Sequence, residues 1–326
     1  MIDTPSSAND PARELRDLLA AGRFREALEA YRRAGPLPAR PEVALLAATA
    51  ATRVGELSTA RELARGAEQQ FTARADADGR MRTANLLGAI AFEQGNLTEA
   101  EAGFGRALEL ARQLEDGQMA ARTSNNLASV AHLRGRTDRA LSLYRGALLE
   151  YQRLGDRRGT AETYHNLGLT FRELAIRLDA DSASAEAVRH AEMVGERSLL
   201  ALAIAGRAEY HLDAGEPEVA AREVERAEAL AAAAGDEIGG AEAGRLRARI
   251  ALVENEAAHA LDAAEKARAT AARYGSMLLQ GECAALAARA LERLGRMQEA
   301  NARKAEAAGI FRRLGATHLL ERLEAN

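Results

Sequence analysis

Residues 84–113 read ANLLGAIAFEQGNLTEAEAGFGRALELARQ, and residues 124–153, which begin 40 residues later, read SNNLASVAHLRGRTDRALSLYRGALLEYQR. Few letters are identical, but a glycine occupies the same place in both stretches, at Gly95 and at Gly135. Apolar residues at helical spacing lie on both sides of each glycine. Because glycine adopts the positive φ of a tight helix-to-helix turn without steric cost, each stretch predicts two antiparallel helices.

The 40-residue spacing continues along most of the chain. Its turn positions are Gly55, Gly95, Gly135, Ala175, Gly215, Asn255 and Gly295. Two further positions hold alanine without interruption: Ala60, Ala100, Ala140, Ala180, Ala220, Ala260 and Ala300, and Ala67, Ala107, Ala147, Ala187, Ala227, Ala267 and Ala307. Such small side chains let neighbouring helices approach closely. The pattern therefore predicts an array in which each helix pair packs against the next.

A second set of glycines closes each unit. It comprises Gly155, Gly195, Gly235, Gly275 and Gly315, and Glu115 takes the same position in an earlier unit. An acidic residue often follows, as in Gly155-Asp156. We expect these glycines to cap the end of one helix, and the acids to cap the start of the next.

The unit resembles a tetratricopeptide repeat. The small, apolar and aromatic positions of that family's motif are matched by Leu87, Gly88, Gly95, Ala100, Phe104 and Ala107, and again by Leu127, Ala128, Gly135, Ala140, Tyr144 and Ala147. The period is longer than the family's usual 34 residues, and the proline near the end of the family's repeat is missing. Such lengthened units are similar to those of kinesin light chains and of effector-sensing regions in bacterial transcriptional regulators. The resemblance implies an all-α, right-handed α-solenoid.

We expect the solenoid to span residues 9–316 as eight antiparallel helix pairs. The first pair is shorter, with Gly22 as its turn residue, and the other turns lie at the seven positions given above. Residues 1–8 are expected to be a disordered tail. Residues 317–326 are expected to form a short helix that caps the last repeat, whose apolar face would otherwise be exposed.

The composition agrees with an all-α protein and excludes several other classes. Hydrophobic residues make up 47% of the chain, mostly alanine and leucine, and only 4% of residues are aromatic. The net charge of −4 argues against a general nucleic-acid binder, and no apolar run is long enough to span a membrane. The N-terminal residues lack the basic and apolar regions of a signal peptide, and one cysteine cannot form an internal disulfide. We therefore expect a cytoplasmic location.

In the tetratricopeptide family the first helix of each pair lines a concave groove. The resemblance assigns the following groove residues to the third, fourth and fifth units of this chain: Arg82, Asn85, Phe92, Arg122, Asn125, Asn126, Ser129, His132, Glu162, His165, Asn166 and Arg172. An asparagine amide both donates and accepts hydrogen bonds, so the asparagines could bind the backbone of a peptide. The alternative is that they connect adjacent helices or face water.

The groove of the later units is charged instead. Its residues are Glu209, Asp213, Glu242, Arg245, Arg249, Glu282, Arg289, Glu292 and Arg293. We expect many of them to pair with one another at helical spacing.

No residue pattern predicts catalysis, a metal site or a cofactor. The six histidines lack metal-ligand spacing. Gly103-Phe104-Gly105 lies within a predicted helix and does not follow a strand, so it is not a phosphate loop. Cys283 has no partner histidine nearby in sequence and is best interpreted as a small core residue.

The favoured function is therefore a non-enzymatic adaptor or sensor that holds a protein or peptide partner in its groove. One alternative is a structural scaffold that self-assembles, as a homo-oligomer, or joins a larger complex. Another is the sensory subunit of a transcriptional regulator. We expect neither direct nucleic-acid binding nor membrane insertion.

Overall fold

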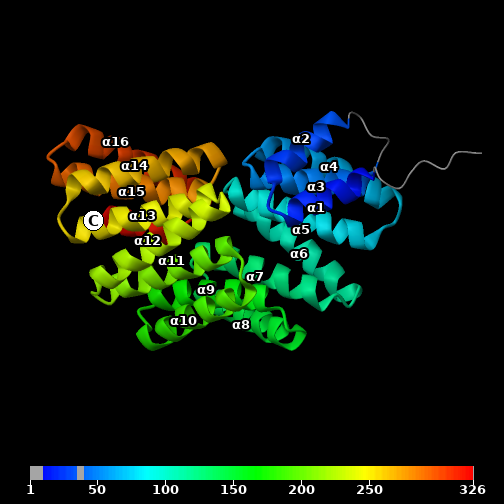
Figure 1. The fold of residues 1–326 in the computed structure, drawn as a ribbon, viewed down its shortest axis with the longest axis horizontal. Helices are drawn as coiled ribbons and strands as arrows, with labels where there is room; N and C mark the ends of the chain where they lie inside the picture. Colours follow the sequence, from blue (N-terminus) through cyan, green and yellow to red (C-terminus); the bar gives the residue numbers. More distant parts are fainter. Residues whose placement is uncertain (1–9, 35–39, 326) are drawn as a thin grey trace, which may run out of the picture. The chain divides into compact units, whose positions relative to one another are not determined.

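The computed structural model describes residues 10–34 and 40–325, so the tail expected at residues 1–8 lies outside the described residues. Within those ranges the regular structure is entirely helical (Figure 1). The helices are α1 (Pro11–Ala20), α2 (Phe24–Arg33), α3 (Pro41–Arg53), α4 (Leu57–Ala73), α5 (Ala77–Glu93), α6 (Leu97–Gln113), α7 (Gly117–Leu133), α8 (Thr137–Leu154), α9 (Arg157–Glu173), α10 (Arg177–Val194), α11 (Arg197–Asp213), α12 (Pro217–Ala234), α13 (Glu237–Val253), α14 (Ala257–Tyr274), α15 (Met277–Arg293), α16 (Met297–Leu314) and α17 (Thr317–Ala325). The predicted all-α class is confirmed.

The turn residues adopt the backbone conformation that the repeat predicts. Gly135 has a φ of 69° and Gly215 a φ of 84°. Where the repeat has another residue the conformation is the same, with φ at 56° for Ala175 and 63° for Asn255. A side chain in this left-handed region meets steric strain that glycine avoids. The repeat thus imposes this turn geometry, and Ala175 and Asn255 adopt it at a cost in conformational free energy.

The boundaries between helix pairs also follow the predicted capping pattern. Gly155 ends α8 with a φ of 70°, and the carboxylate of Asp156 accepts a hydrogen bond from the Gly159 backbone N–H at 3.0 Å. Asp236 caps α13 in the same way, accepting from the Gly239 N–H at 2.9 Å. These bonds satisfy one of the free N–H groups at the start of each helix.

The described chain divides into two compact units. The N-terminal unit consists of the described residues up to 94 and residues 98–116, and it contains α1 to α5 and nearly all of α6. The C-terminal unit consists of residues 95–97 and the described residues from 117 onwards, and it contains α7 to α17.

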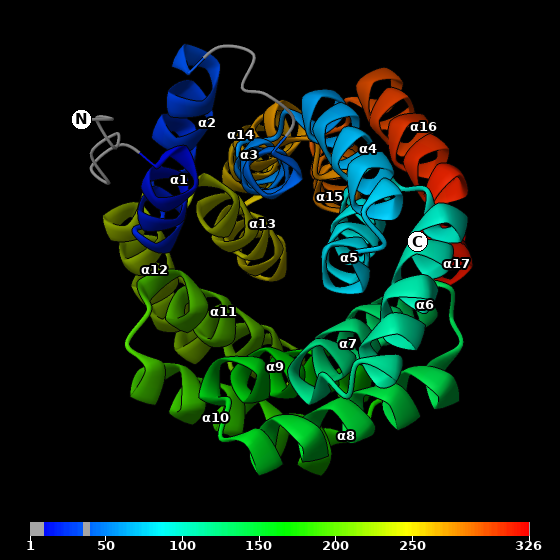
Figure 2. The ribbon, with the colours of Figure 1, turned by 90° about the vertical axis from the view of Figure 1, so that its right-hand side faces the viewer.

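In the C-terminal unit the odd-numbered helices line the concave side. Each of α7, α9, α11 and α13 packs on the next odd-numbered helix as well as on its own partner. The even-numbered helices of the described part of this unit have at most marginal contact with one another. Closer spacing of one layer bends the stack towards that layer, and α7, α9, α11 and α13 accordingly lie inside α8, α10 and α12 (Figure 2). We call the concave surface of α7, α9, α11, α13 and α15 the inner face.

The core is built from the small residues of the repeat. All fourteen alanines of the two uninterrupted sets are at most 4% exposed. Larger side chains fill the remaining gaps where a glycine leaves room, as where the ring of Tyr151 on α8 covers Gly159 on α9. Cys283 is fully buried, as predicted. No described helix has the length and apolar character needed to span a bilayer.

Candidate ligand-binding face

The twelve predicted groove residues fall in both units. Arg82, Asn85 and Phe92 lie on α5 of the N-terminal unit, and the other nine lie on α7 and α9 of the C-terminal unit. On α5, the exposed Arg82 forms an ion pair with Asp78 one turn earlier, at 2.9 Å, while Asn85 and Phe92 are half-buried.

The asparagines of α7 and α9 contact each other. Asn125 is only 8% exposed, and its Oδ1 accepts from the Thr163 hydroxyl at 3.2 Å and from Asn166 Nδ2 at 3.4 Å. These bonds connect one inner helix to the next. For Asn125 and Asn166 the geometry therefore favours the helix-connecting interpretation over peptide contact. Asn126 is half-buried on the same turn of α7.

Ser129 and Arg122 both reach across to α8. The Ser129 hydroxyl lies 3.0 Å from the Tyr144 hydroxyl and also donates to the Asn125 carbonyl at 3.2 Å. Burial raises the pKa of Tyr144 far above its ordinary value, so this phenol stays neutral. Arg122 is exposed and hydrogen-bonds Tyr151. These contacts hold the polar side chains of α7 in place against the outer layer.

The two predicted histidines lie in partly desolvated positions. Burial lowers the pKa of His165 to about 4, and its Nδ1 has no hydrogen-bond partner among the described residues. The His165 ring lies against Gly206 of α11, where a side chain would collide with it. Burial also lowers the pKa of His132, whose ring contacts Thr170 at 3.3 Å and lies 6.2 Å from the ring of His318 on α17. Both histidines are therefore neutral at neutral pH.

Glu209 of α11 is the centre of a buried charge network on the inner face. It is 2% exposed and forms ion pairs with Arg172 of α9 and Arg245 of α13. Burial alone would raise its pKa, but the surrounding arginines outweigh burial and hold the pKa well below its usual range. A carboxylate buried among guanidinium groups from both neighbouring helices fixes those groups in position.

The network extends to either side of Glu209. Asp213, one turn further along α11, binds both Arg172 and Arg249 at 2.7 Å. Arg245 Nε also lies 3.0 Å from Glu242 and 3.5 Å from Glu282 of α15. The charged residues of the later units do pair with one another, as predicted. However, most of these pairs join neighbouring helices and are not formed at helical spacing within one helix.

Glu282 differs from Glu209 in its ionisation. Burial raises its pKa to about 7, and the nearby carboxylates of Glu242 and Glu209 act in the same direction. Arg245 opposes them without overcoming the burial. Two buried carboxyl groups of the inner face thus differ, because Glu209 is ionised at neutral pH and Glu282 titrates near neutral pH. The remaining predicted residue, Glu162 of α9, pairs with Arg158 at 3.0 Å.

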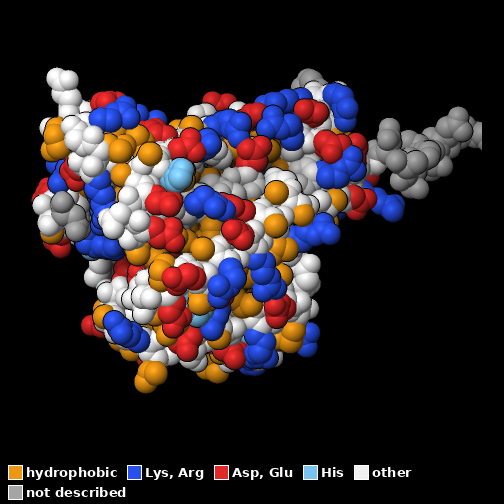
Figure 3. All heavy atoms as spheres, turned by 60° about the vertical axis from the view of Figure 1, so that its left-hand side comes forward, with side chains coloured by type: hydrophobic (Ala, Val, Ile, Leu, Met, Phe, Trp, Pro, Cys, Tyr) orange, Lys and Arg blue, Asp and Glu red, His pale blue; other side chains and the backbone are white. Residues whose placement is uncertain are grey.

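The inner face as a whole can form directed polar contacts. Amide, carboxylate and guanidinium groups are interspersed on it, and basic and acidic side chains also mix over the surface drawn in Figure 3. Within residues 10–34 and 40–325 no group of three or more His, Cys, Asp and Glu side chains could hold a metal ion. The chemistry available is hydrogen bonding and ion pairing.

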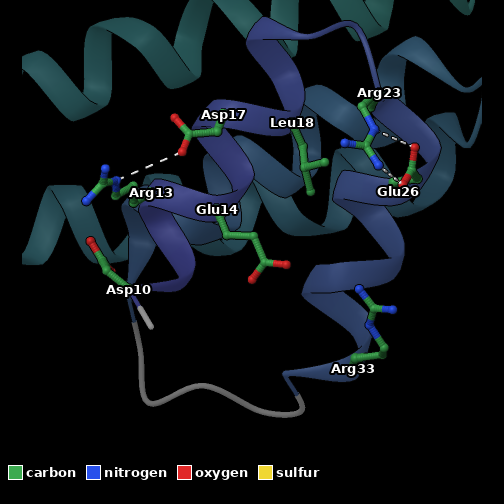
Figure 4. A pocket seen from close by; sticks show the side chains of 8 residues that line it. All are labelled: Asp10, Arg13, Glu14, Asp17, Leu18, Arg23, Glu26 and Arg33. Atoms are coloured by element: carbon green, nitrogen blue, oxygen red, sulfur yellow. Dashed lines mark hydrogen bonds and ion pairs between the residues drawn. The ribbon is translucent and has the colours of Figure 1, made fainter. Parts of the chain in front are cut away.

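Two hollows of the described surface lie elsewhere. One of about 560 Å³ lies at α1 and α2, where Arg13 pairs with Asp17 at 3.9 Å and Arg23 with Glu26 (Figure 4). Another of about 400 Å³ is lined by residues of α14, α15 and α16. Neither contains a predicted groove residue. The inner face is a concave surface that is open to solvent. A ligand can therefore bind there without an enclosed cavity.

Comparison with known proteins gives a consistent result for the fold. The family model described as "Tetratricopeptide repeat" matches residues 79–148 and 119–175. None of the curated protein sequences compared with the chain matches it.

Several solved structures are similar over most of the chain. The Rap conjugation gene regulator of plasmid pLS20, solved in complex with the Phr* peptide, has a TM-score of 0.68 at 14% identity, covering 97% of this chain and 95% of that one. A Rap protein complexed with Competence and Sporulation Factor has a TM-score of 0.65 at 14% identity, covering 97% and 96%. A signal-transduction ATPase from Pyrococcus horikoshii with a tetratricopeptide repeat sensor has a TM-score of 0.55 at 15% identity, covering 91% and 45%. At these identities the similarity concerns the fold, and it confirms the predicted resemblance to repeat regions of bacterial regulators.

Proposed function

We propose that this tetratricopeptide-repeat protein binds a peptide, or an extended segment of a partner protein, on the inner face of its C-terminal unit and catalyses no reaction. The observation that carries the proposal is the network around Glu209. Arg172, Glu209 and Arg245 come from three successive inner helices and hold one another in position. Preorganised polar groups lose little side-chain freedom when a ligand binds, which favours binding on this surface.

Two further facts support a peptide as the ligand. The inner face carries both donors and acceptors, and the N–H and C=O groups of an extended backbone need both. Two of the structurally similar proteins, a Rap protein and the pLS20 regulator, were solved with Competence and Sporulation Factor and with the Phr* peptide. The proposed site differs from the one predicted from the sequence in two respects. It is centred on α9, α11 and α13, and in it Asn125 and Asn166 connect helices.

The test is selection of peptides from a random pool of short peptides by the immobilised protein, followed by measurement of each enriched peptide's Kd by fluorescence anisotropy. The inner-face variant Asp213→Ala/Arg249→Ala, which removes an ion pair that joins α11 to α13, is compared with Glu192→Ala/Arg226→Ala, which removes an exposed ion pair between the outer helices α10 and α12. We expect the inner-face variant to bind about tenfold or more weakly, which corresponds to ~1.4 kcal/mol, and the outer variant to bind like the wild type. If no peptide is enriched, or if both variants bind equally, the proposal is wrong.

A second function is favoured by one surface feature. The turn between α9 and α10 exposes Leu174 and Ile176, and the first turn of α10 exposes Leu178, which is 86% exposed. Contiguous exposed apolar side chains are typical of protein contact sites. This favours the scaffold alternative, in which the protein assembles through that turn. Light scattering over a concentration series would detect such assembly, and Leu178→Glu should abolish it while leaving peptide binding intact.

A further inference from the structure

Three apolar side chains are exposed where α9 is followed by α10, and we call Leu174, Ile176 and Leu178 the apolar corner. The repeat shows that this corner departs from the pattern. At the position of Leu178 the preceding repeat holds Asp138 and the following repeat holds Glu218. Charged residues suit a turn that faces water, so apolar residues in their place indicate a contact surface.

The corner also carries two charged residues that have no partner. Arg177 and Asp179 are exposed and lie on either side of Leu178 in the sequence. Neither of them forms an ion pair with a residue that the structure describes. The corner therefore presents one positive and one negative group beside its apolar side chains.

The hollow of about 400 Å³ at α14, α15 and α16 is a complementary surface, and we call it the outer hollow. Its apolar lining consists of Leu261 of α14, Leu291 of α15 and Ala302 of α16. One repeat earlier the position of Ala302 holds Asp262. The small apolar residue at this position thus belongs to the repeat that forms the hollow and not to the repeat before it.

The rim of the outer hollow carries charges of both signs. Arg296 and Glu299 line it and pair with each other at 2.6 Å, with about half of each side chain exposed. An ion pair this exposed contributes little to stability, so its members can exchange partners at little cost. Leu294 and Met297, close to Arg296 in the sequence, are exposed as well and extend the apolar surface beside the rim.

The corner does not fill the outer hollow of its own chain, because Leu178 is 86% exposed. We propose that the apolar corner of one copy docks into the outer hollow of a second copy of this chain, with Leu178 against Leu261 and Ala302. The inference rests on the second proposed function, assembly through the α9–α10 turn, and identifies the surface that receives the turn. The two surfaces differ, so the contact is heterologous and one copy can use both of them at once.

The charges beside the two surfaces complement each other. In the docked arrangement Arg177 faces Glu299 of the second copy, and Asp179 faces its Arg296. An apolar centre with a charged rim is the usual arrangement of a protein interface. Opposite charges at such a rim fix the register of the two molecules and favour their encounter.

The first experiment uses variants that complement each other. Leu178→Glu disables the corner, and Ala302→Glu places a charged side chain in the outer hollow from an exposed position of α16. Light scattering over a concentration series measures the mass of each variant and of their equimolar mixture. We expect each variant alone to assemble about tenfold or more weakly than wild type. The mixture should form a heterodimer, because it still contains one intact corner and one intact hollow.

The matched control is Leu149→Glu, which changes a leucine of α8 that is 70% exposed and lies outside both surfaces. It should assemble like wild type, and circular dichroism confirms that all three variants are folded. Wild-type assembly by Ala302→Glu, or a mixture that stays monomeric, would refute the outer hollow as the receiving surface and leave assembly through the turn standing. A wild-type protein that is monomeric throughout, or normal assembly by Leu178→Glu, would refute both.

The second experiment tests the contact directly with cysteines. Leu178→Cys and Ala302→Cys are made separately in a Cys283→Ala background, which leaves no other thiol, and are then mixed and oxidised. We expect the disulfide-linked heterodimer to be the main product, because the two side chains meet in the docked arrangement. A Leu178→Cys homodimer as the main product would show that two corners meet each other, and it would overturn the proposal.

Discussion

Asn166 on α9 donates from its Nδ2 to the Oδ1 of Asn125 on α7 at 3.4 Å, and the buried Thr163 hydroxyl donates to the same oxygen at 3.2 Å. One amide oxygen thus joins two inner helices across a repeat boundary. A peptide backbone could use this oxygen only by displacing bonds that already hold α7 to α9.

The variant Asn125→Ala should therefore lower stability. It removes both bonds from a position that is 8% exposed, at a cost of about 1 to 2 kcal/mol. Chemical denaturation followed by circular dichroism measures the change. Ser142→Ala on the exposed surface of α8 is the control and should change stability by less than about 0.5 kcal/mol. Equal stability of the two variants would contradict the helix-connecting role.

Removing the charge of Glu209 should be more damaging. In Glu209→Gln, Arg172 and Arg245 lose a carboxylate that is 2% exposed, and we expect a loss of about 3 kcal/mol. The control is Glu237→Gln, because the Glu237–Arg273 pair is more than half exposed and should contribute less than about 1 kcal/mol. A denaturation series on both variants tests this, and a Glu209→Gln protein as stable as wild type would show that the network contributes nothing.

Glu282 should make stability depend on pH near neutrality. Its pKa in the folded protein is about 7, above the ordinary value of 4.5, so folding favours the protonated carboxyl. Stability should then fall as the pH rises from 4.5 to 7 and change no further above that range, because the unfolded chain releases this proton first. In Glu282→Gln that contribution is absent. Relative to wild type, the variant should gain on the order of 2 kcal/mol between about pH 5 and about pH 8, since one pKa unit corresponds to ~1.4 kcal/mol. A constant difference would refute the raised pKa.

The turn residue Ala175 offers a stabilising substitution. Its φ of 56° is strained for alanine and unstrained for glycine, so Ala175→Gly should raise stability by about 1 kcal/mol. Ala214, which precedes the next turn glycine, has a φ of −76°, and Ala214→Gly should instead lower stability by roughly 0.5 to 1 kcal/mol. Thermal melts of the two variants should shift in opposite directions, and a shift in the same direction would contradict the strain at Ala175.

Two glycines within helices should respond oppositely to alanine. At Gly146 in α8 an added methyl group meets nothing within 4 Å, so Gly146→Ala should stabilise the helix by about 1 kcal/mol. At Gly159 in α9 the methyl group would overlap the buried ring of Tyr151, and we expect a loss of about 1 to 3 kcal/mol. Calorimetry of the pair tests whether the ring can move aside, and an unchanged melting temperature in Gly159→Ala would show that it can.

The repeat was predictable because its constraints are local. Turn glycines, capping acids and small residues must recur at fixed distances along the chain, so Gly155, Asp156 and the buried alanines are visible as spacing alone. The same spacing shows that Asn125 and Asn166 share a face. It does not show whether their amides meet, because that depends on side-chain rotamers and on how far α9 is rotated against α7.

The charge network was harder to predict for the same reason. Arg172 pairs with Asp213, 41 residues further on, and Arg245 pairs with Glu209, 36 residues earlier. These separations differ from the 40-residue repeat by one residue in one direction and by four in the other. A long side chain on an inner helix can extend towards the preceding or the following inner helix. The sequence alone therefore does not show which acidic residue an arginine will pair with. The boundary between the two units could not be predicted either, because no linker and no change of composition marks it in the sequence.

The single cysteine, Cys283, can report local opening of the structure around α15. Cys283 lies on α15 beside Glu282, fully buried among Ala241, Ala271 and Leu279. Burial raises the pKa of its thiol far above the usual value, so a thiol reagent reacts only after α15 separates from its neighbours. No other cysteine competes for the reagent. The rate at which Cys283 is labelled therefore measures how often α15 separates from its neighbours. A ligand that bridges α13 and α15 stabilises the packed state of α15 and lowers the labelling rate accordingly.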